Sequence, residues 1–264
     1  MAELETSLKR TDRGTIAPKN TSLLVGELEK KLLQEMPSED ACSWDRTGML
    51  VGNPLEVVRG VAIALDPTIP TIKATKEAGA NVLVTHHPVF LEAPDSFVPD
   101  VIQGHTPGAV VRFACEQGIS IMSFHTALDV SIAGLAALPK LLRLKPIGVL
   151  EPLEKGSDKG FGQICEPTAD GDAEQGISLR HLSARCVSVF ESLPRVWGSS
   201  DRVVNRIVAC GGSAGSLLQE CLDQGIECLI CGEAKYHEAL DASLSGLSII
   251  ELGHDVSEFP LCAL

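Results

Sequence analysis

Apolar positions along the chain follow two spacings that alternate, one typical of helices and one typical of strands. Residues 22–36 (SLLVGELEKKLLQEM) carry apolar side chains at helical spacing and end before Pro37, which predicts an amphipathic helix. The next elements are a strand, a helix, a strand, a helix and a strand, over residues 57–65, 69–78, 81–85, 108–117 and 119–124. This alternation predicts a mainly parallel sheet covered by helices on both faces.

The segment 131–200 is less regular, with a leucine-rich helix candidate, a stretch rich in glycine and charge, and a further helix near 176–189. The alternation returns after Arg202, with a strand over 203–210, a helix over 216–224 and a strand over 227–231. The second run therefore has the same order of elements as the first.

The two runs also match residue by residue. An offset of 146 places Val61 on Ile207, and an offset of 129 places His125 on His254 and Asp129 on Glu258. We therefore predict a duplicated α/β fold, whose two halves have mixed, mainly parallel sheets and are related by a pseudo-twofold axis. The predicted parts of this one domain are a flexible tail, a first half, a connecting segment and a second half, over residues 1–20, 21–135, 136–200 and 201–264.

Two adjacent histidines, His86 and His87, follow the predicted strand 81–85. Ligands collect at the carboxyl ends of parallel strands, and neutral imidazole is a common ligand of divalent transition metals. Neighbouring side chains of an extended segment point to opposite sides, so each histidine is expected to serve a different ion. The alternative is a pair of polar loop residues.

A histidine and a carboxylate four residues apart follow the last strand of each half, as His125 with Asp129 and His254 with Glu258. If each pair opens a helix or turn, its two side chains lie on one face. Mixed nitrogen and oxygen ligands favour Zn, Mn, Fe, Co or Ni over Ca or Mg. This many ligands suits two divalent ions about 3.5–4 Å apart, as in two-metal hydrolases.

Other polar clusters are candidates for contacts with substrate. Glu233, Tyr236 and His237 occupy the second-half position of His86 and His87, and could transfer protons or simply cap a helix. The loop 211–216 (GGSAGS) could hold an anion on backbone N–H groups or form a tight turn. Cys228 and Cys231 form a C-x-x-C pair, which could be a redox or zinc site or two core residues of a strand.

Charge and composition limit the kinds of binding partner and the cellular location that are expected. The net charge is −13 and the sequence has no basic run, so nucleic-acid binding is not expected. No stretch approaches a membrane span, and scattered cysteines without a signal peptide indicate reduced thiols and a cytoplasmic location.

Six motifs together resemble the GTP cyclohydrolase 1 type 2 homologs, also called Nif-three-like dinuclear metal proteins. They are WDRTGMLVGNP, VLVTHHPVF, FHTALDV, ACGGSAGS, CGEAKYHEALDA and ELGHDVSE, in family order over residues 44–258. The resemblance implies a toroidal homohexamer with two metal ions per chain. It implies metal ligation by His86, His87, Asp129, His254 and Glu258, with Glu258 as the bridge and His125 orienting Asp129 or serving as an occasional ligand. Arg46 and Ala127 depart from the family pattern at positions where Asn is common.

Two functions follow from these observations. The first is a metal-dependent hydrolase that acts on a nucleotide or phosphoester, with Glu258, His237, Glu233 and His125 as the candidate catalytic residues. The second is a non-catalytic metal-binding ring that acts as a scaffold or regulator. No nucleophile-base triad is evident in the sequence, which keeps the second hypothesis open.

Overall fold

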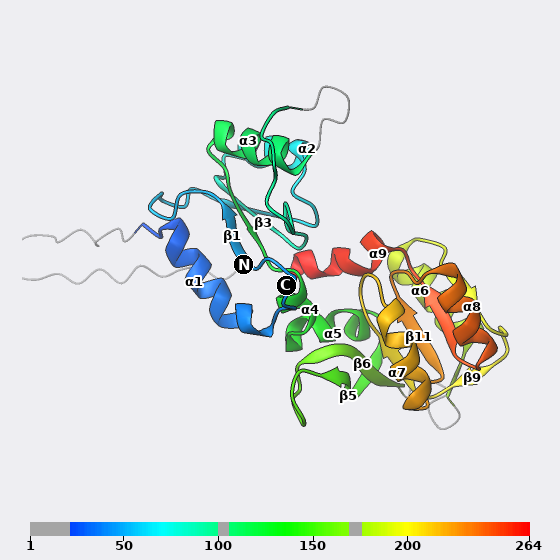
Figure 1. The fold of residues 1–264 in the computed structure, drawn as a ribbon. Coiled ribbons are helices and arrows are strands. Elements are labelled where there is room, and N and C mark those ends of the chain that lie inside the picture. The colour runs from blue at the N-terminus through cyan, green and yellow to red at the C-terminus, as the bar shows by residue number, and fades with distance from the viewer. Residues whose placement is uncertain (1–21, 100–105, 169–175) are drawn as a thin grey trace, which may run out of the picture.

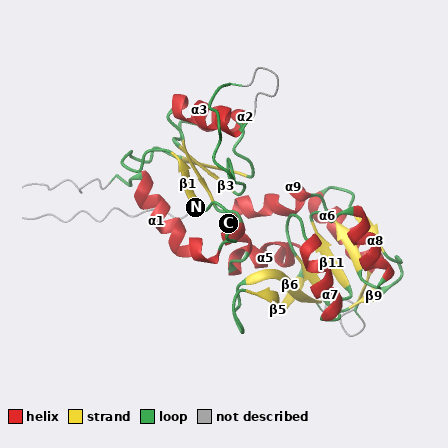
Figure 2. Cartoon of the chain, in the orientation of Figure 1, coloured by secondary structure: helices red, strands yellow, loops and turns green. Residues whose placement is uncertain are grey.

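The computed structural model describes residues 22–99, 106–168 and 176–264. The tail predicted over 1–20 lies outside these residues. The described chain forms two large sheets flanked by helices and one small two-stranded sheet. The short helices α4 (Thr126–Asp129) and α9 (His254–Glu258) lie between the two large sheets with α5 (Ile132–Leu141) (Figures 1 and 2). No helix among the described residues is long and apolar enough to cross a membrane.

The first sheet has four strands in the order β1-β4-β3-β2. They are β1 (Gly48–Val51), β2 (Val61–Ala64), β3 (Val82–Thr85) and β4 (Ser120–Ser123). Strands β2, β3 and β4 are parallel, and β1 runs antiparallel to β4. Helices α2 (Ile69–Glu77) and α3 (Pro107–Gln117) cover one face, and α1 (Val25–Glu35) covers the other (Figure 1).

Alternation along the strands explains why both faces are covered. On β3, Leu83 packs into the cluster under α2 and α3, whereas Val82 packs with Val25 of α1. Adjacent strand residues point to opposite faces, so a strand that is apolar throughout needs helices on both sides. Helices α2 and α3 begin where the hydroxyls of Thr68 and Thr106 accept a backbone N–H, which satisfies one donor at each helix start.

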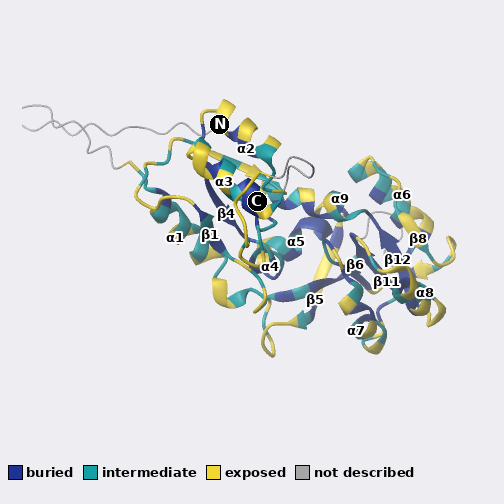
Figure 3. Cartoon of the chain, turned by 45° about the horizontal axis from the view of Figure 1, so that its top comes forward, coloured by how far each residue is buried: buried dark blue, intermediate teal, exposed yellow. Residues whose placement is uncertain are grey.

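The second sheet has six strands in the order β5-β6-β10-β11-β12-β8. They are β5 (Leu144–Pro152), β6 (Gly160–Pro167), β8 (Arg195–Trp197), β10 (Ile207–Ala209), β11 (Cys228–Cys231) and β12 (Ser248–Glu251). Its helices are α5 (Ile132–Leu141) and α6 (Leu179–Phe190) on one face, and α7 (Leu218–Asp223) and α8 (Tyr236–Leu244) on the other. Figure 3 shows the central strands buried between these layers.

The remaining elements are short. They are η1 (Ser38–Asp40), α4 (Thr126–Asp129), β7 (Ile177–Ser178), β9 (Val203–Val204), η2 (Gly215–Leu217), α9 (His254–Glu258) and η3 (Phe259–Ala263).

Three stretches differ from the sequence predictions. The strand expected over 57–65 begins at Val61, because Val57 instead bridges Leu24 ahead of α1. The strand expected over 203–210 is split into β9 and β10, since the N–H groups of Asn205 and Arg206 donate to the Glu227 carboxylate at 2.6 and 2.9 Å. The segment described as irregular contains the long β5–β6 hairpin, whose register shifts between Pro146 and Gly148.

The two sheets share one arrangement of strands. The parallel strands β2-β3-β4 with antiparallel β1 on the β4 edge match β10-β11-β12 with antiparallel β8 on the β12 edge. Val61 pairs with Val82 as Ile207 pairs with Cys228, so the offset of 146 also holds in the strand register. The pseudo-twofold relation between the halves stays a prediction.

Cys228 and Cys231 are core residues. They lie on opposite faces of β11, in different apolar clusters, and both thiols are free and buried. Burial raises the pKa of the Cys228 and Cys231 thiols far above the usual range. Their side chains cannot share a zinc ion or a disulfide, so the core interpretation is confirmed.

Candidate metal centre

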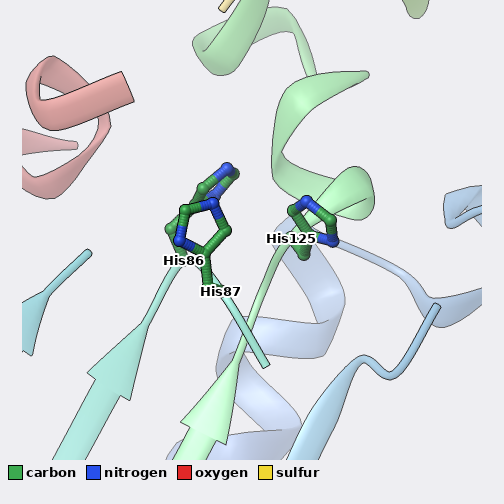
Figure 4. A group of neighbouring side chains, drawn as sticks. All are labelled: His86, His87 and His125. Atoms are coloured by element: carbon green, nitrogen blue, oxygen red, sulfur yellow. The ribbon is translucent and has the colours of Figure 1, made fainter. Parts of the chain in front are cut away.

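The predicted ligands come together where the carboxyl edge of the first sheet meets the last helix of the second half. His86 and His87 follow β3, and His125 follows β4 as the residue that precedes α4 (Figure 4). The ring centroids of His86 and His87 lie 5.1 and 5.5 Å from that of His125. Helix α9 brings His254 to His87, with ring centroids 5.4 Å apart.

All four imidazoles are held in place from outside the cluster. In each ring, Nδ1 lies within hydrogen-bond distance of an oxygen. The pairs are His86 with the carbonyl of Phe124 (3.2 Å), His87 with Asp66 (2.9 Å), His125 with Asp45 (3.2 Å) and His254 with Glu233 (3.0 Å). A carbonyl or carboxylate can only accept, so Nδ1 carries the proton and Nε2 of the neutral ring offers its lone pair. This is the outer support that metal-binding histidines commonly have.

Three of the four Nε2 atoms converge on the carboxylate of Glu258. His86 Nε2 lies 3.6 Å from Oε1, while His87 and His254 Nε2 lie 3.0 and 3.2 Å from Oε2. Asp129 completes the group, with Oδ1 3.5 Å from His86 Nε2. The expectation that His254 and Glu258 share one helical face is confirmed, because α9 begins at His254 and contains both.

These contacts need a cation. In the neutral rings, lone pairs on Nε2 would face lone pairs on carboxylate oxygens. His86 Nε2 and Glu258 Oε2 are buried and have no hydrogen-bond partner among the described residues. Buried polar atoms are seldom left unpaired, because the lost hydration costs about 1–3 kcal/mol for each. Either a proton or a metal ion between the atoms removes the conflict.

The pKa values of His86 and His87 are raised, which also shows that the cluster favours positive charge. The nearby Glu258 carboxylate, with a further contribution from Asp66, raises the pKa of His87 to about 9. Together the two carboxylates outweigh burial, which lowers this pKa. Burial opposes the charged form of His86, but Glu258 and Asp129 still raise its pKa. An environment that favours an additional proton on these rings also favours a metal cation that displaces it.

The two carboxylates are tuned in opposite directions. Burial alone would raise the pKa of Glu258, but His86 and His87 lower it to about 2. Burial raises the pKa of Asp129 to about 6, although His86 and His125 oppose that rise. Glu258 is therefore the permanent negative charge at the centre of the cluster.

Glycines of the second half make room for Glu258. A Cβ on Gly212, which has φ +61°, would clash with Glu258 Oε1. A Cβ on Gly232 would stand 2.5 Å from the carbonyl oxygen of Gly212 and 2.6 Å from Ser257 Oγ. Ser257 Oγ accepts the N–H of Gly212 at 2.9 Å and donates to the carbonyl of His254 at 2.8 Å. Gly212 and Gly232 thus let α9 pack closely against the sheet, and both alternatives for the loop 211–216, anion binding and a tight turn, stay predictions.

Asp45 and Asp66 were not identified from the sequence as site residues. The fully buried carboxylate of Asp45 contacts His125 and accepts hydrogen bonds from the backbone and hydroxyl of Thr126. Despite burial, these bonds hold the pKa of Asp45 well below its usual range. A usable signal was present for Asp66, since it follows β2 at the same sheet edge as His86.

Of the other candidate site residues predicted from the sequence, some contact the cluster and others lie away from it. Glu233 reaches the cluster through His254 Nδ1. His237 is exposed on α8, where its ring lies 5.2 Å from that of Tyr236, and neither lines the cavity next to the metal cluster. His181 is exposed, as expected, and His105 lies outside the described residues.

Two overlapping groups have the composition of metal sites. One contains His86, His87 and His125, and the other contains His87, His254 and Glu258, each with ligand atoms within 4.8 Å of one another. His125 is therefore close enough to His86 and His87 to share a metal ion with them, and its position is not limited to orienting Asp129. The donors are imidazole nitrogens and carboxylate oxygens, which suit a divalent transition ion.

Fold and cluster together define a class: an α/β protein whose two sheets meet at buried His and Glu side chains that could hold a metal ion. The chain belongs to the Duf34/NIF3 (NGG1p interacting factor 3) family, whose model matches residues 23–263. The family resemblance of the motifs is thereby confirmed.

Named relatives and solved structures agree with this assignment. A "GTP cyclohydrolase 1 type 2 homolog" of Streptomyces coelicolor is 29% identical over 238 residues, which are 86% of this chain and 79% of that protein. A protein of the same name from Clostridium acetobutylicum is 27% identical, over 82% of this chain and 78% of that one. A hypothetical protein of Staphylococcus aureus has the same fold, with a TM-score of 0.80 at 24% identity, covering 91% of this chain and 90% of that one. A Bacillus cereus protein related to NIF3 has a TM-score of 0.77 at 19% identity, covering 88% and 89%.

Proposed function

We propose that the chain binds two divalent metal ions and is a metal-dependent hydrolase that acts on a nucleotide or phosphoester. The arrangement of Glu258 carries the proposal, since Oε1 faces His86 while Oε2 faces His87 and His254. One carboxylate that offers its two oxygens to different imidazoles is suited to bridge two ions. His86 and Asp129 would hold one of them, and His87 and His254 the other, with Zn, Mn, Fe, Co or Ni as the candidate metals.

Bound divalent ions would supply Lewis acidity and make water a better nucleophile near neutral pH. The protein's own part is to hold substrate and move protons. His125 lines the cavity next to the cluster, and its Nδ1 is fixed by Asp45. Its ring is thus placed to take a proton from the attacking water and return it to the leaving group. Glu233 keeps the proton on His254 Nδ1 and orients that ring.

Self-association into a homohexamer belongs to the same proposal. The edge strand β2 exposes Val61 and Ile63, at 43% and 58% of their surface, which supports contact with another copy. A cytoplasmic location also belongs to it, since all nine cysteines are free.

The direct test is hydrolysis by protein loaded separately with Mn, Fe, Co, Ni or Zn, assayed against GTP and a panel of aryl phosphoesters. We expect turnover with at least one metal, abolished in Glu258→Gln and unchanged in the exposed control Glu166→Gln. Absence of turnover with every metal, at normal metal content, would instead support a non-catalytic ring that acts as a scaffold or regulator.

A further inference from the structure

A cavity of about 430 Å³ lies directly against the metal cluster. His125, Asp129, His254 and Glu258 contribute to its wall. Much of the rest of the lining is apolar and comes from both halves and the segment that connects them, including Leu135, Leu138, Phe161 and Leu217. Such a volume is within the range of small-molecule sites, so the cavity can take the organic part of a substrate whose reacting bond lies at the cluster.

An aromatic residue of the first half contributes to this cavity. Trp44 lines it with 55% of its surface exposed, and its ring lies edge-to-face on His125 at a centroid distance of 5.7 Å. An exposed indole beside an apolar cavity offers a large contact area to a planar ring.

The charged groups of the cavity are acidic. Among the described residues that line it there is no Lys or Arg, and the charged side chains besides the histidines are Asp129, Glu258 and Glu151. A triphosphate chain carries several negative charges that must be matched by cations or hydrogen-bond donors. Metal ions at the cluster would match one phosphate group, but the remainder of the cavity has no basic side chain to match others.

Glu151 is the acidic residue of this cavity that the metal cluster does not explain. It lies on β5, and within the described part of the chain its carboxylate has neither an ion pair nor a hydrogen bond. Partial burial, together with Glu220 of α7, raises its pKa above the usual value. A carboxylate that is partly removed from water loses hydration energy, and here no hydrogen-bond donor of the described chain compensates that loss. A ligand with N–H groups would compensate it by donating to the carboxylate.

We infer that Glu151 and Trp44 select a planar nitrogen heterocycle, whose N–H groups donate to the Glu151 carboxylate while its ring packs against Trp44. The ligand carries no polyphosphate chain, because no basic side chain lines the described wall of the cavity, and any single phosphate group of a nucleotide or phosphoester would lie at the cluster. The inference rests on the proposed function only in placing the reacting bond at the metal cluster.

Two nearly isosteric probes test the selectivity by calorimetric titration. The first is 2-aminobenzimidazole, which offers adjacent N–H donors, and the second is 2-methylbenzimidazole, in which a methyl replaces the amino group. We expect the amino compound to bind at least about tenfold more tightly to the wild-type protein, since hydrogen bonds to a charged acceptor are worth about 1.5–3 kcal/mol. Glu151→Gln should bring the ratio close to one, Glu220→Gln should leave it unchanged, and Trp44→Ala should weaken both probes alike.

Equal binding of the two probes by the wild-type protein would overturn the inference even if Glu151→Gln failed to fold. Displacement of 2-aminobenzimidazole by GTP from protein without metal would also overturn it, because the triphosphate would then occupy the cavity. Titrating metal-free and metal-loaded protein in parallel separates this inference from the hydrolase proposal. Probe selectivity without metal uptake or turnover would support the inference alone, whereas uptake and turnover without selectivity would support the hydrolase alone.

Discussion

The two sheets have the same strand order, but their carboxyl edges contribute to the His-carboxylate cluster in different ways. After β3, the first half places His86 and His87, whereas the second half places Gly232 and Glu233 after β11. After β2, the first half has Asp66, which contacts His87 Nδ1, and the same offset of 146 leads to Gly212 in the second half. Side chains fill the first edge, while glycines leave space at the second.

This difference shows how two sheets with the same strand order can build one asymmetric site. The first half supplies histidines from strand ends, and the second half supplies the space that lets α9 insert Glu258 among them. Glycine is required at positions 212 and 232 because a Cβ there would clash with neighbouring atoms. This requirement is one of space and does not depend on backbone flexibility. Substitutions in the two halves are therefore expected to have different effects on stability and metal affinity.

Replacement of Gly232 should have the largest effect on stability. In Gly232→Ala the new Cβ would meet the backbone of Gly212, which cannot move without displacing α9. We expect a loss of about 2–4 kcal/mol in the free energy of unfolding, measured by urea denaturation. Gly148→Ala is the matched control, because a Cβ there meets nothing within 4 Å. Similar losses in both variants would show that the second edge is not closely packed.

Replacement of Gly212 should separate metal binding from stability. In Gly212→Ala the clash is with the end of the Glu258 side chain, which can swing away and leave the cluster. Gly225 has a similar φ of +67° with open space around it, so Gly225→Ala shares only the backbone strain. We expect both to lose about 1 kcal/mol of stability, and only Gly212→Ala to lose about 100-fold or more in metal affinity, measured by competition with a chelator. Equal metal affinities would mean that Gly212 does not position Glu258.

The Nδ1 acceptors of the two halves should also differ. Asp45 is fully buried, whereas the Glu233 side chain is 57% exposed. Glu233 supports the proposed ligand His254, so Glu233→Gln should lower metal affinity, but by less than about tenfold, because water can replace an exposed acceptor. Asp45 supports His125, which is proposed to transfer protons, so Asp45→Asn should lower turnover by about 10–100-fold at nearly unchanged metal affinity. Chelator competition and the hydrolysis assay measure the two effects, and a larger loss of metal affinity in Asp45→Asn than in Glu233→Gln would contradict these roles.

Metal affinity should rise with pH at the first edge. In the metal-free protein Glu258 and Asp66 raise the pKa of His87 to about 9, so a proton must leave before a metal binds. Below that pKa the proton competes, and affinity should rise by up to about tenfold per pH unit from pH 7 toward about pH 9, then level off above it. Asp66→Asn should move the plateau to lower pH. Affinity that is flat between pH 7 and 9 would show that His87 is not a ligand.

The local pattern of the chain predicted much of this picture. Helices such as α2 and α3 end within a residue of their expected limits, because capping threonines and terminal glycines are local signals. The histidines and carboxylates were found because they follow predicted strands at matching positions of two similar runs of sequence. Asp45 was not assigned a role, since it meets His125 across 80 positions of sequence, a contact that only the tertiary fold creates. The β5–β6 hairpin was missed because Pro146 and Gly148 interrupt its alternation.

The central claim is that the His-carboxylate cluster holds a pair of metal ions, and the metal content of the purified chain tests it most directly. Elemental analysis, combined with a mass measurement in solution, should give roughly two divalent ions per chain, by analogy with two-metal sites. The count should fall in His86→Ala and stay unchanged in the exposed control His181→Ala. Less than about one ion per chain after loading, with no further loss in His86→Ala, would contradict the account.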